Sequence, residues 1–198
     1  MTAATASAPV LCLASASPRR RELLMQIGVP HLVVPARLDE GRESEEPPTQ
    51  YVQRLARAKA LEVWQRQATL PVLAADTAVV GDGVIFGKPR DRDDALTMLA
   101  ALSGRSHEVL TAVTLCTERG VDSALSTSTV RLRPLTAAER ESYWRTGEPR
   151  DKAGAYAIQG LGAVFIESLA GSYSGVMGLP LYETAALLRA ASVPCGVA

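Results

Sequence analysis

The sequence predicts an α/β fold with a mixed β-sheet. Short apolar runs typical of buried strands alternate with segments of helical period, an order that favours parallel strands joined by helices. Two pairs of β-rich runs also follow one another across turns, as antiparallel hairpins do. The chain has 198 residues, 47% of them hydrophobic, which is enough to bury one well-formed core.

The first part of the chain predicts strand, helix, strand and long helix. The apolar run at 9–15 indicates a buried strand, and Pro18 suits the first position of the helix after it. A second strand is expected at 31–36 (HLVVPA). An acidic loop with two prolines then leads to a long helix, for which Thr49 is the predicted N-cap. Lys59 falls on the apolar stripe of this helix rather than on its polar face.

The middle of the chain predicts a strand, a hairpin and a helix. Residues 71–76 (PVLAAD) indicate a buried strand that ends at an acid. Residues 77–89 hold a Gly-Asp-Gly turn between two β-rich runs, which predicts a hairpin. Asp91 or Asp93 should begin the next helix, which a Ser-Gly pair ends.

The last part predicts a second hairpin, a capped helix and a glycine-rich region. Two runs with alternating β-branched residues, 107–117 and 126–135, should pair across a loop at 118–125. Thr136 is followed by a glutamate three residues later, which is the capping-box spacing. Residues 151–191 then predict a glycine-rich loop, a strand, a second such loop and a terminal helix.

The charge balance limits the partners of the chain. Lys+Arg and Asp+Glu each number 21, and a zero net charge argues against the basic face that binding of a long nucleic acid requires. Among the 21 cations only Lys59, Lys88 and Lys152 are lysine. A lysine is a compact charge that suits close contact with a phosphate oxygen. Their retention in an arginine-rich chain therefore points to a phosphate, with chance retention as the alternative.

Cysteine usage and the N-terminal segment predict a cytoplasmic protein. The 3 cysteines are widely spaced and odd in number, which fits neither a disulfide framework nor a thiolate metal site. The N-terminal segment lacks the basic start of a signal peptide, and its apolar run is too short to span a bilayer. Neither export nor membrane anchoring is expected.

The segment SASPRRRELL is a candidate anion site. A loop that follows a strand and enters a helix presents free backbone N–H groups and the positive end of the helix dipole. Ser15, Ser17 and the run Arg19–Arg21 add hydroxyl and guanidinium donors, and guanidinium groups bind phosphate through two parallel hydrogen bonds. The alternative is an ordinary capped surface helix.

Two acidic positions are candidate metal ligands or catalytic groups. Asp76 follows an apolar strand, and ligands of open α/β sheets bind at the carboxyl ends of strands. Asp39-Glu40 follows the 31–36 strand, and Mg²⁺ prefers one or two carboxylates together with water and phosphate oxygens. The alternative for Asp76 is an aspartate bonded to turn amides, and the alternative for Asp39-Glu40 is a solvated acidic loop.

Other polar residues carry weaker signals. Gln159 lies in AIQGLG, where glycine allows close backbone approach, so its amide suits the edge of a pyrimidine base or a plain turn. His31 and His107 have no ligand spacing and are expected to be structural. Serine-hydrolase, zinc-peptidase and P-loop signatures are missing from the sequence.

An ordered set of segments between about residue 11 and residue 190 resembles the Maf family of nucleotide pyrophosphatases. The segments are SASPRRRELL, RLARAKA, AADTAVV, FGKPRD, LSGRSHEVLTAV, GEPRDKAGAYAIQGLG and SGVMGLPLYET. The resemblance implies an enzyme that hydrolyses nucleoside triphosphates, including modified ones, to the monophosphate and pyrophosphate with Mg²⁺ or Mn²⁺. It also implies a single catalytic domain over residues 1–198, with two lobes around a cleft as in inosine triphosphate pyrophosphatases, and it allows a homodimer.

The branch that acts on dTTP and UTP is the most similar at three positions. That branch carries Arg, Thr and Gln where this chain has Arg19, Thr77 and Gln159, whereas the 7-methyl-GTP branch carries Trp, Gln and Glu. These three residues are therefore expected to set substrate specificity. A 7-methyl-GTP pyrophosphatase and a non-catalytic nucleotide-binding regulator of septum formation are the alternatives.

The resemblance also implies roles for individual residues. Ser15, Arg19, Lys59 and Lys88 would bind the triphosphate, and Glu40 and Asp76 would hold the metal. Asp76 is the expected proton acceptor for the water that attacks the α-phosphorus, with a role as metal ligand alone as the alternative.

Overall fold

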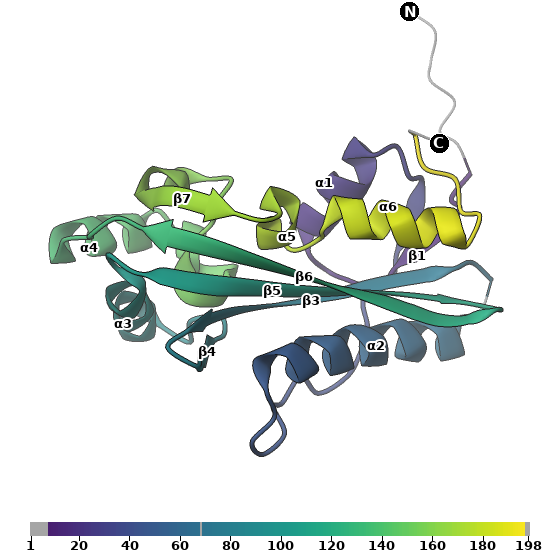
Figure 1. Cartoon of the computed structure of the whole chain (residues 1–198), viewed down its shortest axis with the longest axis horizontal. Helices are drawn as coiled ribbons and strands as arrows, with labels where there is room; N and C mark the ends of the chain where they lie inside the picture. The colour runs from purple at the N-terminus through teal and green to yellow at the C-terminus, as the bar shows by residue number, and fades with distance from the viewer. Residues whose placement is uncertain (1–7, 68, 197–198) are drawn as a thin grey trace, which may run out of the picture.

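A seven-stranded mixed sheet forms the centre of the molecule. The computed structural model describes residues 8–67 and 69–196, so the N-terminal extension lies outside the described residues except for its last positions. The strand order is β2-β1-β3-β5-β6-β7, with β4 paired to β3 (Figure 1). The strands are β1 (Leu11–Leu13), β2 (His31–Val33), β3 (Val72–Gly81), β4 (Val84–Phe86), β5 (Ser106–Thr117), β6 (Gly120–Leu132) and β7 (Ile166–Ala170).

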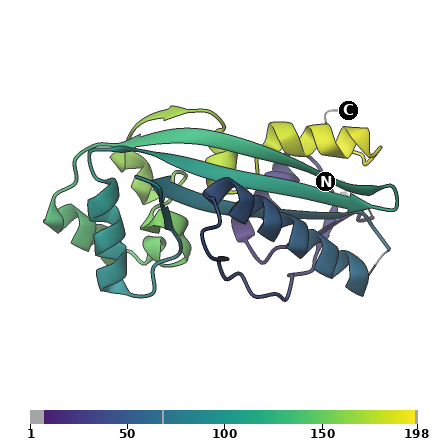
Figure 2. The same ribbon diagram turned by 60° about the horizontal axis from the view of Figure 1, so that its bottom comes forward.

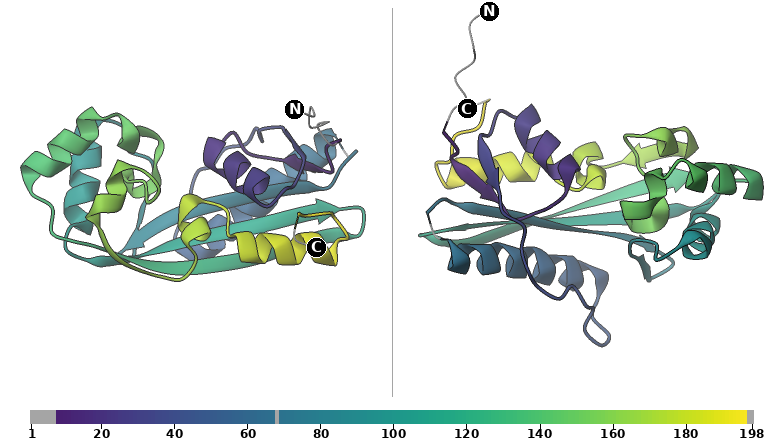
Figure 3. Two further views of the ribbon diagram at one scale, coloured as in Figure 1. Left: turned by 90° about the horizontal axis from the view of Figure 1, so that it is seen from above. Right: turned by 180° about the vertical axis from the view of Figure 1, so that it is seen from behind.

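Helices cover both faces of this sheet. They are α1 (Pro18–Gln26), α2 (Pro48–Arg66), α3 (Arg92–Leu102), α4 (Ala137–Arg145), α5 (Tyr173–Met177) and α6 (Leu181–Ala190), with the 3₁₀ helices η1 (Glu148–Asp151), η2 (Ala153–Ala155) and η3 (Leu161–Phe165). At one end of the molecule, α1 and α6 lie on one face and α2 on the other, while α3 and α4 lie at the opposite end (Figure 1, Figure 3). The predicted α/β class is confirmed.

The sheet contains both strand directions, as predicted. Strand β1 pairs in parallel with β2 and β3, whereas β3, β5, β6 and β7 pair antiparallel in succession. The long strands β3, β5 and β6 run from one end of the molecule to the other (Figure 1, Figure 2). They therefore connect the two groups of helices, which form the expected two lobes.

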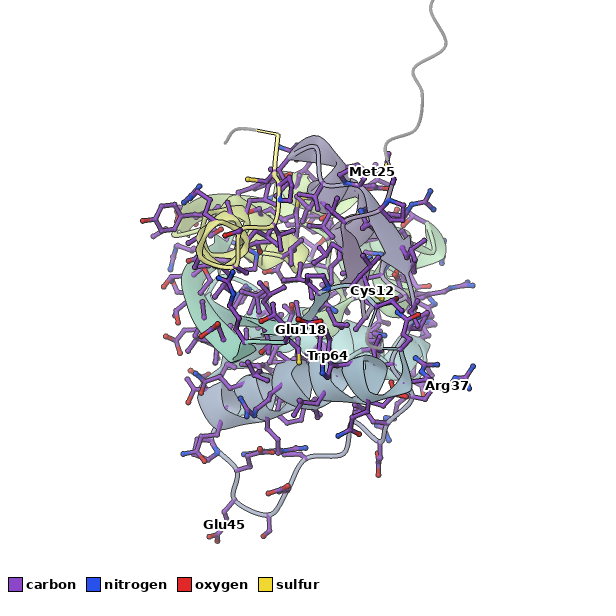
Figure 4. All side chains as sticks on the ribbon, turned by 90° about the vertical axis from the view of Figure 1, so that its right-hand side faces the viewer. Cys12, Met25, Arg37, Glu45, Trp64 and Glu118 are labelled. Carbon is purple, nitrogen blue, oxygen red and sulfur yellow. The ribbon has the colours of Figure 1, made fainter. Side chains whose placement is uncertain are left out.

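The core is divided between the faces by the alternation of strand side chains. Leu73 and Ala75 of β3 pack in the cluster of α1 and α6, whereas Val72 and Ala74 pack toward α2. Because successive residues of a strand point to opposite faces, Asp76 must point to the side of α2. Figure 4, seen from the end that carries the β5–β6 turn, shows Cys12 in the interior and Trp64 of α2 close to it.

Several predicted helix and turn signals are confirmed. Pro18 is the first residue of α1, and the Asp91 side chain caps α3 by accepting from the N–H of Asp94. Thr136 and Glu139 form the predicted capping box of α4. The Gly-Asp-Gly turn joins β3 to β4.

Three predicted boundaries are wrong. Helix α2 begins at Pro48, one residue before Thr49, because Pro47 is extended and the fixed φ of Pro48 suits the first helical position. The predicted 118–125 loop is mostly strand, since β6 begins at Gly120 and pairs with β5 from there on. Strand β3 does not end at Asp76 but continues to Gly81, still paired with β5 on one side.

The described part of the chain has three free cysteines, all buried. No helix of the ranges 8–67 and 69–196 is long and apolar enough to cross a membrane.

We predict that His107 makes the protein sensitive to mild acid. The ring is 3% exposed, its Nε2 lies 2.8 Å from the Tyr156 hydroxyl, and its Nδ1 has no partner among the described residues. Burial lowers the pKa of His107 to about 4. Between about pH 6.5 and pH 4 the unfolded chain therefore binds a proton that the folded protein does not. The free energy of unfolding should fall by about 3 kcal/mol as the pH is lowered through this interval.

Urea unfolding of the wild type and of His107→Gln at several pH values tests this prediction. The variant should lose less stability than the wild type over that interval, because it lacks the titrating ring. His31→Gln, which replaces a partly buried histidine on β2, should retain the pH dependence of the wild type. An identical pH dependence in His107→Gln and the wild type would contradict the prediction.

Candidate active site

A cavity of about 460 Å³ opens between the two lobes. Its walls come from the β1–α1 loop, the segment before α2, α2 itself, the centre of β3, the end of the β3–β4 hairpin and the region from 151 to 159. All eight residues predicted for the site line this cavity: Ser15, Arg19, Glu40, Lys59, Asp76, Thr77, Lys88 and Gln159. Segments far apart in the sequence thus meet at one place.

The cavity exists because one edge of β3 is incompletely paired. On one side β5 pairs with β3 from Val72 to Val80. On the other side β1 pairs only with Val72 and Leu73, and β4 pairs only with 79–81. The interval in between carries Asp76 and Thr77, which therefore face the cavity from an open edge of the sheet.

Lys59 joins the two predicted acids in an ion-pair network. Its Nζ donates to Asp76 Oδ1 at 2.7 Å and lies 2.9 Å from Glu40 Oε2. Lys59 is 8% exposed and Asp76 is 6% exposed, whereas the Glu40 side chain is largely solvent-accessible. Burial raises the pKa of Asp76, while the positive charges of Lys59 and Arg20 oppose that rise.

The segment that carries Glu40 runs alongside α2 (Figure 2). The Tyr51 hydroxyl of α2 donates to the Glu40 carbonyl at 3.2 Å, and Arg54 of α2 donates to the Gly41 carbonyl at 3.0 Å. These bonds fix the segment to the helix, so the Glu40 carboxylate is held near Lys59.

Arg20, which the sequence indicated only as part of the run Arg19–Arg21, is a residue of the site. Its guanidinium donates to Ser15 Oγ at 3.1 Å, to Thr77 Oγ1 at 3.2 Å and to the Gly178 carbonyl at 2.7 Å. Burial lowers the pKa of Arg20, and the Asp76 carboxylate opposes this. Because Arg20 lies between two other arginines, the sequence alone does not indicate which of the three points into the cavity.

The hydroxyl of Thr77 has a defined direction of hydrogen bonding. Thr111 Oγ1 donates to the Gly175 carbonyl at 2.8 Å and lies 3.0 Å from Thr77 Oγ1. Because the single hydroxyl proton of Thr111 is donated to the Gly175 carbonyl, the Thr77 hydroxyl must donate to Thr111 and accept from the Arg20 guanidinium. The predicted specificity residue Thr77 is therefore fixed by a chain of three bonds.

Arg19 lies at the rim of the cavity and is paired. Its Nη1 donates to Asp151 Oδ2 at 3.0 Å, and the Lys152 ammonium contacts the other oxygen of the same carboxylate. Asp151 lines the cavity together with both cations. Lys152 stood out in the sequence as one of three lysines, whereas Asp151 beside it carried no sequence signal.

Lys88 and Gln159 face the cavity without protein partners. Both are exposed, and neither side chain has a hydrogen bond or ion pair with any residue in the described ranges. Lys88 stands between Gly87, whose carbonyl accepts from the N–H of Gly154 at 3.1 Å, and the buried Pro89. The backbone is thus fixed while the ammonium remains available to a ligand.

The oxygen donors of the site fit a divalent cation only in part. Glu40 and Asp76 supply hard carboxylate oxygens, and both reach the same ammonium of Lys59. No group of three or more His, Cys, Asp or Glu side chains in the described ranges could hold a metal ion by itself. The donor set fits a cation that takes its remaining ligands from water and from the phosphate groups of a ligand.

The fold and site define a class of protein. An α/β sheet with a cavity rich in cations, next to a buried carboxylate, is typical of enzymes that act on phosphoric esters or anhydrides. The sequence matches the family described as Maf-like protein over residues 10–191, and the chain belongs to this family.

Similar proteins cover nearly the whole chain. A protein named dTTP/UTP pyrophosphatase from Bordetella parapertussis is 55% identical over 197 residues, with 95% of each chain covered. Proteins of the same name from Bordetella avium (55% identical, 93% of this chain and 96% of the relative) and Saccharophagus degradans (53% identical, 93% and 90%) are also similar. Among solved structures, the Ham1 protein of Staphylococcus aureus has a TM-score of 0.45 at 11% identity, over 62% of this chain and 71% of that chain.

We predict that Lys59→Gln destabilises the fold by about 3 kcal/mol, because it leaves the buried Asp76 carboxylate without its closest counter-charge. Urea unfolding at neutral pH measures the change. Adding Asp76→Asn to Lys59→Gln should restore part of the loss, since the amide carries no charge.

Arg57→Gln is the matched control, because Arg57 lies on the same helix and is exposed. Its free energy of unfolding should stay within about 0.5 kcal/mol of the wild type. A loss of the same small size in Lys59→Gln would show that the Lys59–Asp76 pair does not support the fold.

Proposed function

We propose that this chain is a nucleoside triphosphate pyrophosphatase that hydrolyses dTTP and UTP to the monophosphate and pyrophosphate. The observation that carries the proposal is the single cavity lined by all eight predicted site residues, with Lys88 and Gln159 facing it unpaired. The relatives named dTTP/UTP pyrophosphatase, each at least 53% identical over most of the chain, support it. In this role the protein would remove unwanted pyrimidine nucleotides, including modified ones, from the nucleotide pool.

The triphosphate would be held by the cations of the cavity. Arg19, Lys59 and Lys88 come from three different segments and line the same space, so they can contact different oxygens of the chain of phosphates. The Ser15 hydroxyl already accepts from the Arg20 guanidinium and can give its proton to a phosphate oxygen. Because charge develops on phosphoryl oxygens as the anhydride bond breaks, fixed cations would stabilise the transition state.

Asp76 would act as the proton acceptor. A water that loses a proton to the Asp76 carboxylate attacks the α-phosphorus, and the bond between that phosphorus and the bridging oxygen breaks. The bridging oxygen leaves with the pyrophosphate. Asp76 suits this role because burial raises its pKa, which makes its carboxylate a stronger base than that of an exposed aspartate.

Glu40 and Asp76 are the residues that would hold Mg²⁺ or Mn²⁺. A divalent cation bound there supplies positive charge to the phosphate oxygens. Lys59 lies between these two carboxylates, so its ammonium would keep them close together and limit their mutual repulsion.

The base would be read by Gln159, Thr77 and Arg19. A primary amide can donate and accept at once, which matches the adjacent N–H and carbonyl on the edge of uracil or thymine. Thr77 is fixed by Arg20 and Thr111, and Arg19 is fixed by Asp151. These contacts support a pocket of constant shape, which discrimination between bases requires.

We further propose that residues 1–198 act as one catalytic domain in the cytoplasm on a small nucleotide rather than a long nucleic acid. The three free, buried cysteines support a reducing compartment. The zero net charge supports a small ligand. A homodimer remains a prediction.

A panel of nucleotides tests the proposed activity. We expect pyrophosphate release from dTTP and UTP in the presence of Mg²⁺ or Mn²⁺, and its loss when the metal is chelated. Release from 7-methyl-GTP but not from dTTP or UTP would replace the substrate assignment. Binding of dTTP without release from any triphosphate would favour the non-catalytic regulator.

We predict that Asp76→Asn lowers kcat on dTTP by a factor of about 10² or more, because an amide cannot accept the proton of the attacking water. Single-turnover pyrophosphate release with Mg²⁺ and with Mn²⁺ measures the effect. Asp82→Asn makes the same change at the exposed β3–β4 turn and should retain the wild-type rate. Near-wild-type turnover of Asp76→Asn with either metal would remove Asp76 from the mechanism.

A further inference from the structure

A carboxylate outside the predicted site holds the loop that carries Gln159. Glu148, at the start of η1, accepts three hydrogen bonds. The donors are the Tyr143 hydroxyl at 2.6 Å, the N–H of Leu161 at 2.8 Å and the N–H of Gly162 at 3.0 Å. Two of the three donors are backbone N–H groups of the loop, so Glu148 attaches η1 and α4 to the far end of the loop.

The near end of the same loop is held by Tyr143. Its hydroxyl oxygen accepts from the N–H of Ala157 at 3.1 Å while its proton goes to Glu148. The Tyr143 ring is buried and packs edge-on against Phe165 at 5.0 Å between centroids. Tyr143 and Glu148, which we call the loop clamp, thus fix the loop on both sides of Gln159.

Two glycines make this arrangement sterically possible. A Cβ at Gly160 would overlap the carboxylate of Glu148, and a Cβ at Gly162 would lie 2.6 Å from the Tyr143 hydroxyl oxygen. No side chain can therefore stand between the clamp and the loop backbone. The glycines of AIQGLG serve close approach to protein groups rather than to a ligand.

The charge states of the clamp are fixed at neutral pH. Burial, reinforced by the Glu148 carboxylate, raises the pKa of Tyr143, so its hydroxyl stays protonated and donates. Burial would raise the pKa of Glu148, but the bonds from Tyr143, Gly162 and Leu161 outweigh it and lower that pKa. The hydrogen bonds therefore have a single direction.

The opposite end of η1 reaches another predicted specificity residue. Asp151, its last residue, accepts from Arg19. A four-residue helix thus contacts the Gln159 loop at one end and Arg19 at the other. Gln159 itself has no hydrogen bond within the described part of the chain, so its position depends on the backbone that the clamp holds.

We propose that Glu148 and Tyr143 are positioning residues that set the base preference of the enzyme by fixing the 157–162 loop and hence the amide of Gln159. The inference rests on the proposed pyrimidine nucleotide pyrophosphatase activity. Neither residue is among those that line the cavity. Their effect reaches the base only through the loop.

The ratio of kcat/KM for dTTP to kcat/KM for dGTP tests this inference. In Glu148→Gln the amide nitrogen places a donor against a backbone N–H, so the loop loses part of its support. We expect the ratio to fall about tenfold, chiefly through a higher KM for dTTP. Tyr143→Phe keeps the ring against Phe165 but removes the hydroxyl, so it should lower the ratio in the same way. It provides the test if Glu148→Gln fails to fold.

A double-variant cycle separates positioning from a general structural role. In the Gln159→Ala background, Glu148→Gln should change the ratio no further, because the amide on which it acts is gone. Glu167→Gln is the matched control, since Glu167 is a largely exposed carboxylate of β7 paired with Arg131. It should leave the ratio unchanged.

The outcomes distinguish this inference from the proposed function. A wild type that releases no pyrophosphate from dTTP or UTP would refute the function itself. If the wild type is active and prefers dTTP, but Glu148→Gln and Tyr143→Phe have the same ratio of kcat/KM as the wild type, the loop clamp alone is refuted. An equal effect of Glu148→Gln with and without Gln159 would also overturn the clamp, since the two residues would then act independently.

Discussion

The buried contact between Lys59 and Asp76 is the constraint on which the site depends. Two charges removed from water lose several kcal/mol of hydration each, so neither is tolerated in the core without the other. Lys59 reaches Asp76 at 2.7 Å because it lies on the buried face of α2 and because strand alternation points Asp76 toward that helix. The position of α2 against β3 is therefore fixed by an ion pair as well as by apolar packing, and the same pair places a base beside the cavity.

The open interval of the β3 edge explains how a continuous strand can contribute to a ligand site. On one edge of β3, β1 pairs only with Val72 and Leu73 and β4 only with 79–81, so the residues in between have no neighbouring strand on that edge. Strand β5 supports the other edge without interruption from Val72 to Val80. Asp76 and Thr77 are thus held in a central strand of the sheet while they line the cavity.

Features that depend on local chemistry could mostly be predicted from the sequence, the N-cap of α2 excepted, whereas the extent of β3 and the direction of Arg20 depend on distant segments. The capping box at Thr136 and the proline at the start of α1 depend on residues within one turn, and both were predicted correctly. The extension of β3 beyond Asp76 depends on β5, which is distant in the sequence. The inward direction of Arg20 depends on Ser15, Thr77 and Gly178, and no local pattern distinguishes it from Arg19 or Arg21. The Glu148 contacts with Leu161 and Gly162 join residues 13 and 14 positions apart, so they too lacked a local signal.

The distribution of lysine links composition to the site. All three lysines of the chain, Lys59, Lys88 and Lys152, line the same cavity. Ion pairs away from the cavity in the described ranges use arginine, as in the contacts of Arg92 with Glu141 and of Arg131 with Glu167. A guanidinium is broad and planar, whereas an ammonium fits between two carboxylate oxygens, as Lys59 does between Glu40 and Asp76. Arginine also has a place in the cavity, where the Arg20 guanidinium reaches three separate oxygens, but the cation that fits between two carboxylates is a lysine.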